Sequence, residues 1–165
     1  MLKKNHEVLV FDNFSNSSPV PLDRVKLITN TSIKFVEGDI RDQVLLLEVM
    51  REFVPDAVIH FAGLKAVGEN VQTLMLYYDV NVNGSIELIK AMDIVGCKLF
   101  IFSSSATVYG APEYLSYDED HPTEPVSPYG RTKLMIEQIL QDWVKSNTQN
   151  QAICMRYFNP VGAHK

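Results

Sequence analysis

The residues best placed for chemistry stand in SPYGRTK, where a tyrosine and a lysine lie four positions apart. Ser127 is a good N-cap and Pro128 a good first helical residue, so the sequence predicts a helix that begins here. On that helix Tyr129 and Lys133 lie one turn apart on one face. A phenol beside an ammonium is a candidate acid/base pair, because the positive charge favours the phenolate. A surface tyrosine near a surface lysine has the same spacing, so the pair alone is weak evidence.

A second reactive stretch is FSSSATVYG, which ends an apolar run in hydroxyls. Three serines in succession, Ser103–Ser105, are poorly suited to packing alone. Ser105 could donate to a carbonyl or accept a hydrogen bond from a sugar hydroxyl near Tyr129. We do not expect it to be a nucleophile, because no histidine stands in a motif that would activate it.

Short apolar runs alternate with helical patterns along the 165 residues. The apolar runs are typical of buried parallel strands and span Glu7–Phe11, Ile33–Asp39, Asp56–Gly63, Lys98–Ser105 and Gln151–Asn159. Helical spacing between them predicts helices at about Pro21–Ile28, Asp42–Phe53, Leu74–Val95 and Pro128–Ser146. This alternation predicts one α/β domain built from right-handed βαβ units around a doubly wound parallel sheet.

Polar or small residues stand where each predicted strand ends. They are Asp12, Asp39, Gly63, Ser103–Ser105 and Asn159. Ligands of open parallel sheets bind at the carboxyl ends of the strands, so we expect these residues to meet along one edge. The helix that carries Tyr129 and Lys133 follows the serine strand, and both side chains should reach that edge.

Each edge residue also has a plain structural interpretation. Asp12 could accept both hydroxyls of an adenosine ribose, or it could serve a turn. Asp39 could accept from an adenine amine, or it could cap the helix that starts near Asp42. Gly63 could bring the backbone close to a flat or anionic group, or it could allow a tight turn. Lys65 could meet ribose or phosphate oxygens, or it could be a solvated lysine.

Composition argues against several classes of protein. The net charge is −5 with no basic block, which gives a nucleic-acid partner no support. There is no apolar run long enough to span a membrane and no signal-peptide pattern, so a cytoplasmic protein is expected. The four histidines show no metal-ligand spacing, and no metal is expected. Cys97 and Cys154 stand far apart in apolar surroundings, and we expect buried reduced thiols rather than a disulfide.

Together these pieces resemble the extended short-chain dehydrogenase/reductase family and, within it, the UDP-glucose 4-epimerases. The likeness runs from about Lys4 to the last residue, on HFAGLKAVGE, FSSSATVYG, SPYGRTKLMIEQIL and RYFNPVGAH. The pairing of SSSATVYG with YFNPVGAH is specific to the epimerases, whereas Tyr-x-x-x-Lys marks only the superfamily. The resemblance implies an isomerase of galactose metabolism that interconverts UDP-glucose and UDP-galactose through a transient 4-keto sugar, with NAD tightly bound.

The resemblance also assigns roles to residues. Tyr129 would be the acid/base, Lys133 its electrostatic partner and a ribose ligand, and Ser105 the hydroxyl that orients the sugar. Lys133 and a positive nicotinamide would together lower the pKa of Tyr129 from about 10 toward neutrality. NAD contacts are implied for Asp12, Asn13, Asp39, Ile40, Phe61, Ala62, Gly63, Lys65, Lys133 and Tyr157. UDP-sugar contacts are implied for Ser105, Ala106, Thr107, Phe158 and Asn159, and a homodimer is implied through the helices near residues 74–95 and 128–146.

The chain departs from this family at both ends. The family's first strand and its glycine-rich Gly-x-x-Gly-x-x-Gly turn have no counterpart among the 8 glycines, and no sugar domain follows Lys165. We therefore expect residues 1–165 to form a partial, Rossmann-like NAD-binding domain that does not catalyse epimerisation by itself. The strands near Glu7–Phe11 and Asp56–Gly63 should lack a shared neighbour.

Two other interpretations remain open. The chain could belong to another nucleotide-sugar enzyme of the superfamily. A dehydratase would be expected to place acidic residues after the threonine, whereas Thr107 is followed by Val108 and Tyr109. The chain could instead be a non-catalytic association module that uses the apolar faces of its two long helices.

Overall fold

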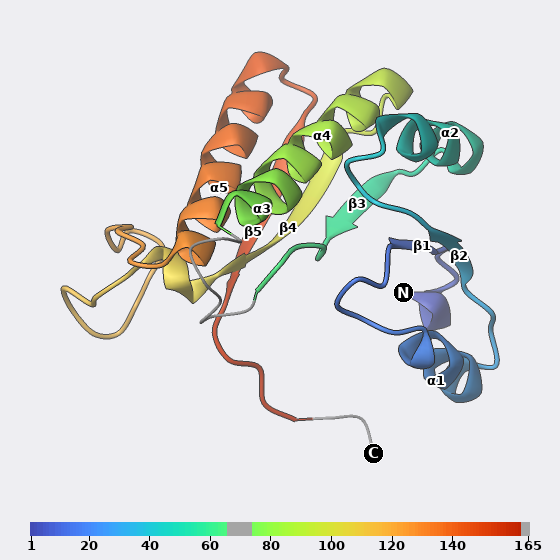
Figure 1. The fold of residues 1–165 in the computed structure, drawn as a ribbon, viewed down its shortest axis with the longest axis horizontal. Helices are drawn as coiled ribbons and strands as arrows, with labels where there is room; N and C mark the ends of the chain where they lie inside the picture. Colours follow the sequence, from blue (N-terminus) through green and yellow to red (C-terminus); the bar gives the residue numbers. More distant parts are fainter. Residues whose placement is uncertain (66–73, 163–165) are drawn as a thin grey trace.

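The structure, a computed structural model, describes residues 1–65 and 74–162 (Figure 1). The strands are β1 (Leu9–Asp12), β2 (Lys34–Glu37), β3 (Ala57–His60), β4 (Leu99–Ser105) and β5 (Gln151–Tyr157). The α-helices are α1 (Val20–Thr29), α2 (Gln43–Phe53), α3 (Leu74–Tyr77), α4 (Gly84–Val95) and α5 (Pro128–Ser146). The 3₁₀ turns are η1 (Leu2–Lys4) and η4 (Ala106–Val108), and η3 (Tyr78–Asn83) is a π-helix. Every predicted strand and helix is present, although most strands are shorter than the apolar runs that predicted them.

The strands form two parallel sheets in this Rossmann-like α/β fold. β1 pairs with β2, and β3, β4 and β5 form the second sheet with β4 at its centre. The prediction of an α/β parallel fold is confirmed. Within the described residues, β1 and β3 share no neighbouring strand, and the sheet is interrupted between them.

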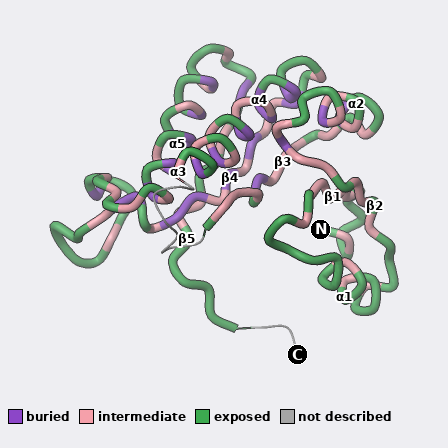
Figure 2. Tube along the Cα trace, viewed as in Figure 1, coloured by how far each residue is buried: buried purple, intermediate pink, exposed green. Residues whose placement is uncertain are grey.

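Helices α2, α4 and α5 lie on one side of the strands and enclose the core (Figures 1 and 2). Phe100 and Phe102 of β4 are fully buried there, against Met92 of α4 and Leu140 of α5. In Figure 1, α1 lies on the other side of β1 and β2 from α2. The buried positions therefore gather where the three-stranded sheet meets its helices, and the two-stranded sheet adds little to the core.

Helix α5 begins as its sequence predicts. The Ser127 hydroxyl accepts a hydrogen bond from the Gly130 amide at 3.0 Å, and Pro128 occupies the first turn. Farther along, the Trp143 indole nitrogen donates to Asp93 of α4 at 2.9 Å. The cap and this anchor fix both ends of the helix, so the side chains of its first turns have defined positions.

The predictions about the cysteines are correct except for the burial of Cys154. Both thiols are free, and Cys97 is buried as predicted. Cys154 is exposed, because β5 is an edge strand among the described residues, where Ile153 is also half exposed. Among the helices of the described residues, none is long and apolar enough to cross a membrane. Within residues 1–65 and 74–162, no group of three acidic, His or Cys side chains could hold a metal ion.

Candidate functional site

The carboxyl ends of β1 and β2 bring together the predicted acidic residues. The Gly38 amide donates to the Asp12 carbonyl at 3.1 Å, and the Asn13 side chain donates to Asp39 at 3.0 Å. The Asn16 amide nitrogen reaches the Gly63 carbonyl, beyond the end of β3, at 3.4 Å. The prediction that Asp12 ends a strand beside the Asp39 segment is confirmed.

Asp12 and Asp39 differ in how many of their carboxylate oxygens accept hydrogen bonds. Both hydrogen bonds to Asp12, from the Phe14 amide and the Ser17 hydroxyl, go to Oδ1 at 2.7 Å. Asp39 is held by Arg41, which donates to Oδ1 at 2.9 Å and to Oδ2 at 2.7 Å. The hydrogen bonds from Arg41 hold the pKa of Asp39 far below its usual range. The two hydrogen bonds to Asp12 support the turn interpretation of that residue.

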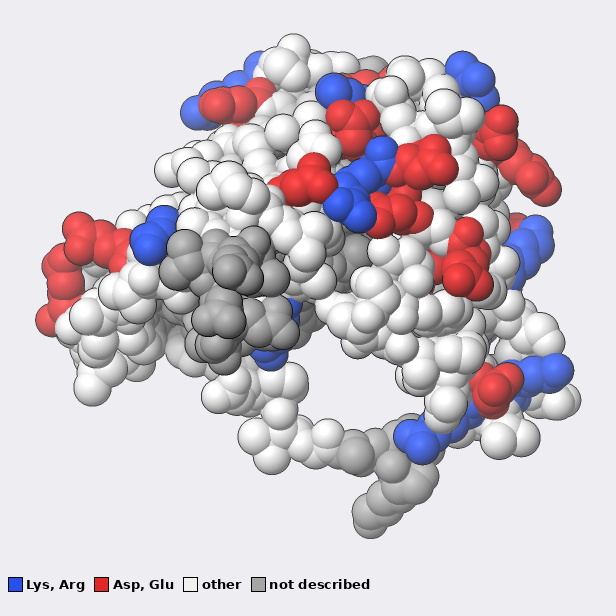
Figure 3. Space-filling model, viewed as in Figure 1, with Lys and Arg blue, Asp and Glu red and all other residues white. Residues whose placement is uncertain are grey.

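Asp39 does not cap the following helix. The N-cap of α2 is Asp42, whose side chain accepts from the Leu45 amide at 3.1 Å. Asp39 is instead one member of an ion cluster, since Arg41 also binds Asp79 at 2.6 Å. Acidic and basic side chains are interspersed on the face that Figure 3 shows, and no extended basic surface is visible there.

Lys133 is buried at the end of the serine strand. Its side chain is enclosed by α5 and β4, and Nζ donates to the Ser103 carbonyl at 2.8 Å. Nζ lies 4.7 Å from the ring centroid of Phe102 and 5.7 Å from that of Tyr129. Burial, followed by the charge of Lys65, lowers the pKa of Lys133 to about 8. An ammonium is therefore held beside the phenol, as the spacing predicted.

The side chain of Tyr129, on α5, meets that of Ser105 at the end of β4. Burial raises the pKa of Tyr129, and a hydrogen bond with the Ser105 hydroxyl acts in the opposite direction. Ser105 Oγ also accepts from the Thr107 hydroxyl at 3.0 Å, which orients it at the end of β4. The net shift of the Tyr129 pKa is upward, because burial disfavours the phenolate. The downward shift expected from the resemblance required a positive nicotinamide as well as Lys133.

The remaining predicted contact residues lie along the carboxyl ends of β3, β4 and β5. Phe61 and Lys65 are exposed beyond β3, and Ala106 and Thr107 form the start of η4. Tyr157 ends β5, and Phe158 and Asn159 follow it with exposed side chains. Ile40 differs, because its side chain is buried against α4, where a Cβ on Gly84 would lie 2.5 Å from it. Residues 66–69 of the HFAGLKAVGE stretch lie outside the described residues.

Gly63 occupies a position that requires glycine. Its φ is +149°, and a Cβ there would lie 3.0 Å from the Asn81 side-chain oxygen. The turn interpretation is supported, and the Gly63 carbonyl also accepts from the Asn16 side chain.

Asn81 is a site residue that the sequence analysis missed. This buried amide accepts from the Leu64 amide at 2.7 Å, and donates to the Leu64 carbonyl and the Thr132 hydroxyl, both at 3.1 Å. It lies in the π-helix η3, a type of distortion frequent at functional sites. Asn81 therefore ties the loop after β3 to α5, next to Lys133. The sequence offered no clear signal, because Asn81 stands between two other polar residues, Asp79 and Asn83.

A largely buried ion pair between β5 and α5 lies next to the site. Arg156 of β5 donates to Glu137 of α5 at 2.8 Å, and Glu137 also accepts from the Ser104 hydroxyl. The Glu137 side chain is 3% exposed. These bonds join α5 to both β4 and β5. The bond to β4 is made by Ser104, the residue before Ser105.

Comparison with curated proteins finds UDP-glucose 4-epimerases that are similar to this chain. A UDP-glucose 4-epimerase of Neisseria meningitidis serogroup C is 49% identical over 166 residues, which cover 100% of this chain and 49% of the relative. The UDP-glucose 4-epimerases of Mus musculus and Bacillus subtilis are 46% and 48% identical, over 99% of this chain. The chain thus spans about half the length of the curated relatives it matches.

Solved structures and a family model agree with these relatives. A Bifidobacterium longum UDP-glucose 4-epimerase in complex with NAD+ and UDP superposes with a TM-score of 0.94 at 48% identity, over 99% of this chain and 49% of that one. A Stenotrophomonas UDP-glucose 4-epimerase, with bound NAD and formylated UDP-arabinopyranose, also has a TM-score of 0.94, at 43% identity over 99% of this chain and 48% of that one. The model of the NAD dependent epimerase/dehydratase family matches residues 1–165. The chain belongs to the NAD dependent epimerase/dehydratase family.

Proposed function

We propose that this chain is the cofactor-binding part of an NAD-dependent UDP-glucose 4-epimerase, which interconverts UDP-glucose and UDP-galactose in galactose metabolism. One observation carries the proposal. Ser105, Tyr129 and Lys133 meet at the carboxyl end of β4, in a chain that is 49% identical to such an epimerase. Residues 1–165 are proposed to form one partial NAD-binding domain of a cytoplasmic enzyme.

The three side chains have separate tasks in this reaction. Tyr129 takes the proton from the sugar's C4 hydroxyl and later returns it. The Lys133 ammonium stabilises the phenolate, at 5.7 Å from the ring centroid. Ser105 orients the sugar hydroxyl toward Tyr129, and its neighbours Ala106 and Thr107 contact the UDP-sugar together with Phe158 and Asn159. When bound, NAD would supply reversible hydride transfer: it would accept the hydride from C4 of the sugar, which gives a transient 4-keto sugar, and would return it.

The residues at the strand ends fit a bound NAD in most respects. Both hydrogen bonds to Asp12 go to Oδ1, which leaves a carboxylate at the strand end suited to ribose hydroxyls. Gly63 offers backbone without a side chain, and Lys133 offers a cation for ribose oxygens. Asp39 fits less well, because Arg41 already binds both of its oxygens. The other residues proposed to hold NAD are Asn13, Ile40, Phe61, Ala62, Lys65 and Tyr157.

A chimera tests the proposal directly. This chain replaces the segment it matches in the Neisseria meningitidis relative, and the purified chimera is given either UDP-galactose or UDP-glucose. We expect both substrates to converge on the same mixture of the two sugars, with NAD retained by the purified protein. A chimera that binds NAD but leaves both sugars unchanged would reject the epimerase proposal, and activity on another UDP-sugar alone would favour a different nucleotide-sugar enzyme.

We also propose a homodimer through the helical segments of residues 74–95 and 128–146. The support is a set of exposed apolar side chains on α3 and α5, namely Met75, Leu76 and Met135. α3 and α5 contact each other on one side of β4, so these side chains belong to neighbouring helices. Sedimentation of the chain and of Met135→Glu checks this, and we expect the variant to be monomeric. A monomeric parent chain would contradict the dimer.

A further inference from the structure

The loop of residues 109–127, here called the connecting loop, joins the two parts of the candidate site. It follows η4 at the carboxyl end of β4 and ends where α5 begins, just before Tyr129 (Figure 1). The Glu124 amide donates to the Tyr109 carbonyl at 3.3 Å, which closes the loop at its base. Gly110 has a φ of +72°, and a Cβ there would overlap the Glu124 carbonyl. The connecting loop is therefore closely tied to the elements that carry the proposed acid/base pair and the serine beside it.

His121 lies buried within the connecting loop and is only 2% exposed. Three tyrosine rings surround it, since the centroids of Tyr109, Tyr114 and Tyr117 lie 5.3, 4.5 and 4.8 Å from that of His121. The Tyr114 hydroxyl donates to Asp118 at 2.8 Å, and the contact of Tyr114 with His121 is made by its ring. The loop therefore packs around the imidazole of His121.

Both ring nitrogens of His121 are hydrogen-bonded within the loop. The Glu113 amide donates to Nε2 at 3.1 Å, so Nε2 carries no proton. Nδ1 lies 2.9 Å from the Pro122 carbonyl, to which it donates the single ring proton. A second proton, on Nε2, would face the Glu113 amide, which can only donate. The closed loop therefore requires the neutral form of His121.

The groups around His121 make it the natural sensor of pH in this cluster. In the described part of the chain, the titratable groups that face its ring are the three tyrosines and the loop acids Glu113 and Asp118. Arg156 of β5 lies over the Tyr109 ring, with Cζ 4.8 Å from the centroid. The hydrogen bond with Asp118 raises the pKa of Tyr114 to about 12. Histidine ordinarily changes charge between roughly pH 5 and pH 8, whereas carboxyl groups and tyrosines ordinarily do so outside this range.

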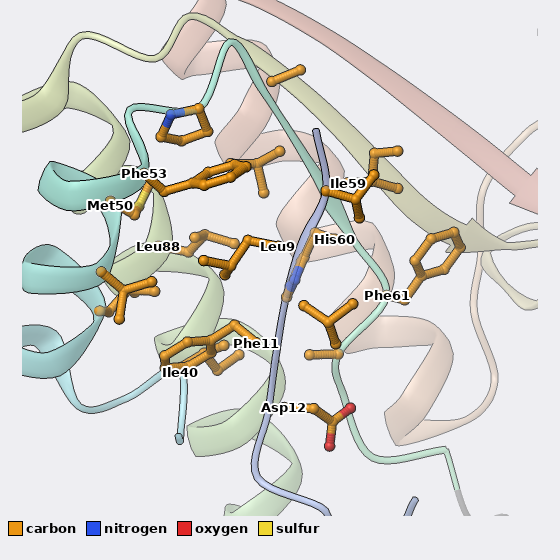
Figure 4. Close-up of a pocket in the computed structure, with 18 of the residues that line it drawn as sticks. Leu9, Phe11, Asp12, Ile40, Met50, Phe53, Ile59, His60, Phe61 and Leu88 are labelled. Carbon is orange, nitrogen blue, oxygen red and sulfur yellow. The ribbon is translucent and has the colours of Figure 1, made fainter. Parts of the chain in front are cut away.

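His60 is also buried, but it does not respond in the same range. Figure 4 shows His60 in the lining of a pocket that is otherwise mostly apolar. Its Nε2 lies 2.9 Å from the Ser85 hydroxyl. Burial, followed by the charge of Lys133, lowers the pKa of His60 to about 3. His60 therefore stays neutral over the range in which histidines ordinarily titrate.

The connecting loop also contacts a residue proposed to bind the UDP-sugar. Tyr117 stacks on Tyr109 with centroids 4.9 Å apart, and its ring lies 5.7 Å from that of Phe158. Phe158 follows β5 and is 57% exposed, so Tyr117 covers part of an otherwise open side chain. The position of Phe158 therefore depends on whether the loop stays closed.

We propose that His121 is a positioning residue that acts only in its neutral form. Neutral His121 holds the connecting loop closed and, through Tyr117, holds Phe158 in place for the UDP-sugar. Protonation of His121 breaks the bond from the Glu113 amide, releases the loop and weakens binding of the UDP-sugar. The effect on the UDP-sugar rests on the proposed epimerase function, whereas release of the loop is a property of this chain alone.

Nuclear magnetic resonance of the 165-residue chain between about pH 8 and pH 5 tests the release of the loop. We expect the protection factor of the Glu113 amide to fall by at least about tenfold on acidification. This fall should occur at the pH at which the imidazole nitrogen resonances of His121 show protonation. The contact between the rings of Tyr117 and Phe158 should be lost at the same pH.

Three variants separate the acceptor from the charge. The side-chain oxygen of His121→Gln can accept from the Glu113 amide without titrating, so this variant should keep the amide protected at both pH values. His121→Leu has no acceptor and should leave the amide unprotected at both. His6→Gln removes an exposed histidine and should keep the acid-dependent loss of the parent chain.

The chimera with the Neisseria meningitidis relative tests the effect on the UDP-sugar. At about pH 5 the KM for UDP-galactose should be at least about threefold lower with His121→Gln than with the parent sequence, with a similar kcat. At about pH 8 the two KM values should agree. Comparing the two proteins at one pH removes the separate effects of pH on Tyr129 and Lys133, which both share.

Each part of the proposal has a result that would overturn it. Protection of the Glu113 amide that stays constant from pH 8 to pH 5, or falls at a pH other than that of His121 protonation, would show that His121 does not control the loop. An acid-dependent loss in His121→Gln equal to that of the parent would assign the effect to another group. Equal KM values of the two active chimeras at pH 5 would remove the link to the UDP-sugar. Amide exchange decides the behaviour of the loop whether or not the chimera turns over, so failure of the epimerase proposal is distinguishable from failure of this one.

Discussion

At the scale of single residues, the notable feature of the candidate site is a buried lysine, Lys133. Lys133 is only 4% exposed, and burial lowers its pKa to about 8, from 10.5 for a free lysine. The bond to the Ser103 carbonyl partly compensates for the lost hydration. Holding this ammonium beside Tyr129 therefore lowers the stability of the fold, which agrees with the functional role proposed for Lys133.

This cost predicts how stability depends on pH. Between about pH 8 and pH 10.5 the unfolded chain binds the Lys133 proton more tightly than the folded chain does. The free energy of unfolding should therefore rise with pH in that window, by about 3 kcal/mol at most. Lys133→Met should flatten this rise, as measured by urea unfolding at several pH values. Lys145→Met, which removes an exposed lysine of the same helix, serves as the control and should keep the rise. An unchanged slope in Lys133→Met would contradict the account.

The residue types predicted part of the site but not its supports. Tyr129, Lys133 and Ser105 could be chosen because their spacing and strand-end position have chemical meaning. Asn81 could not be chosen, since its contacts are with the Leu64 backbone and with Thr132, which are far from it in the sequence. Cys154 was misjudged because its apolar sequence neighbours do not show that one side of β5 is uncovered.

At the scale of elements, α5 is the helix that carries Tyr129 and Lys133, the proposed acid/base pair. Its bounds were predictable because Ser127 and Pro128 mark the start and the apolar residues repeat at helical spacing. The helix predicted over residues 74–95 is present but interrupted by the π-helix η3, which hydrophobic periodicity does not reveal. The short strands were recognisable by composition, and their exact ends were not.

The cap of α5 should contribute measurably to stability. Ser127→Ala removes the acceptor of the Gly130 amide, and we expect a loss of about 1 kcal/mol in the free energy of unfolding. Ser127→Asp keeps a side-chain acceptor and should restore most of that loss, because aspartate is also a good N-cap and favours the positive helix terminus. Equal stability of the two variants in urea titrations would show that this cap does not hold the start of α5.

At the scale of the whole molecule, the two sheets differ in how firmly they are held. β4 has a neighbour on each side and carries fully buried phenylalanines, whereas β1 and β2 form a two-stranded sheet with intermediate or exposed residues. Two-stranded sheets are marginal by themselves. The alternation of strands and helices in the sequence predicted a parallel α/β fold. It did not by itself predict that β1 and β2 would form a sheet separate from β3, β4 and β5.

Amide hydrogen exchange should therefore be slower in the three-stranded sheet than in the two-stranded sheet. We expect amides of Phe100 and Phe102 to exchange slowly, through nearly global unfolding, and those of Val10 and Phe35 to exchange by local opening. The difference should be at least about a hundredfold in protection, measured by NMR or mass spectrometry under native conditions. Equal protection in both sheets would show that the molecule unfolds as one unit.

The turnover of Tyr129→Phe in the chimera with the Neisseria meningitidis relative tests the central claim most directly. Removing one hydroxyl should lower the rate of UDP-galactose conversion by about 10² to 10⁴-fold, because the acid/base group is lost while the ring remains. NAD should stay bound, and the matched variant Tyr114→Phe, in an exposed loop, should keep the full rate. A Tyr129→Phe chimera that converts UDP-galactose at the parent rate would contradict the role of the tyrosine–lysine pair in this chain.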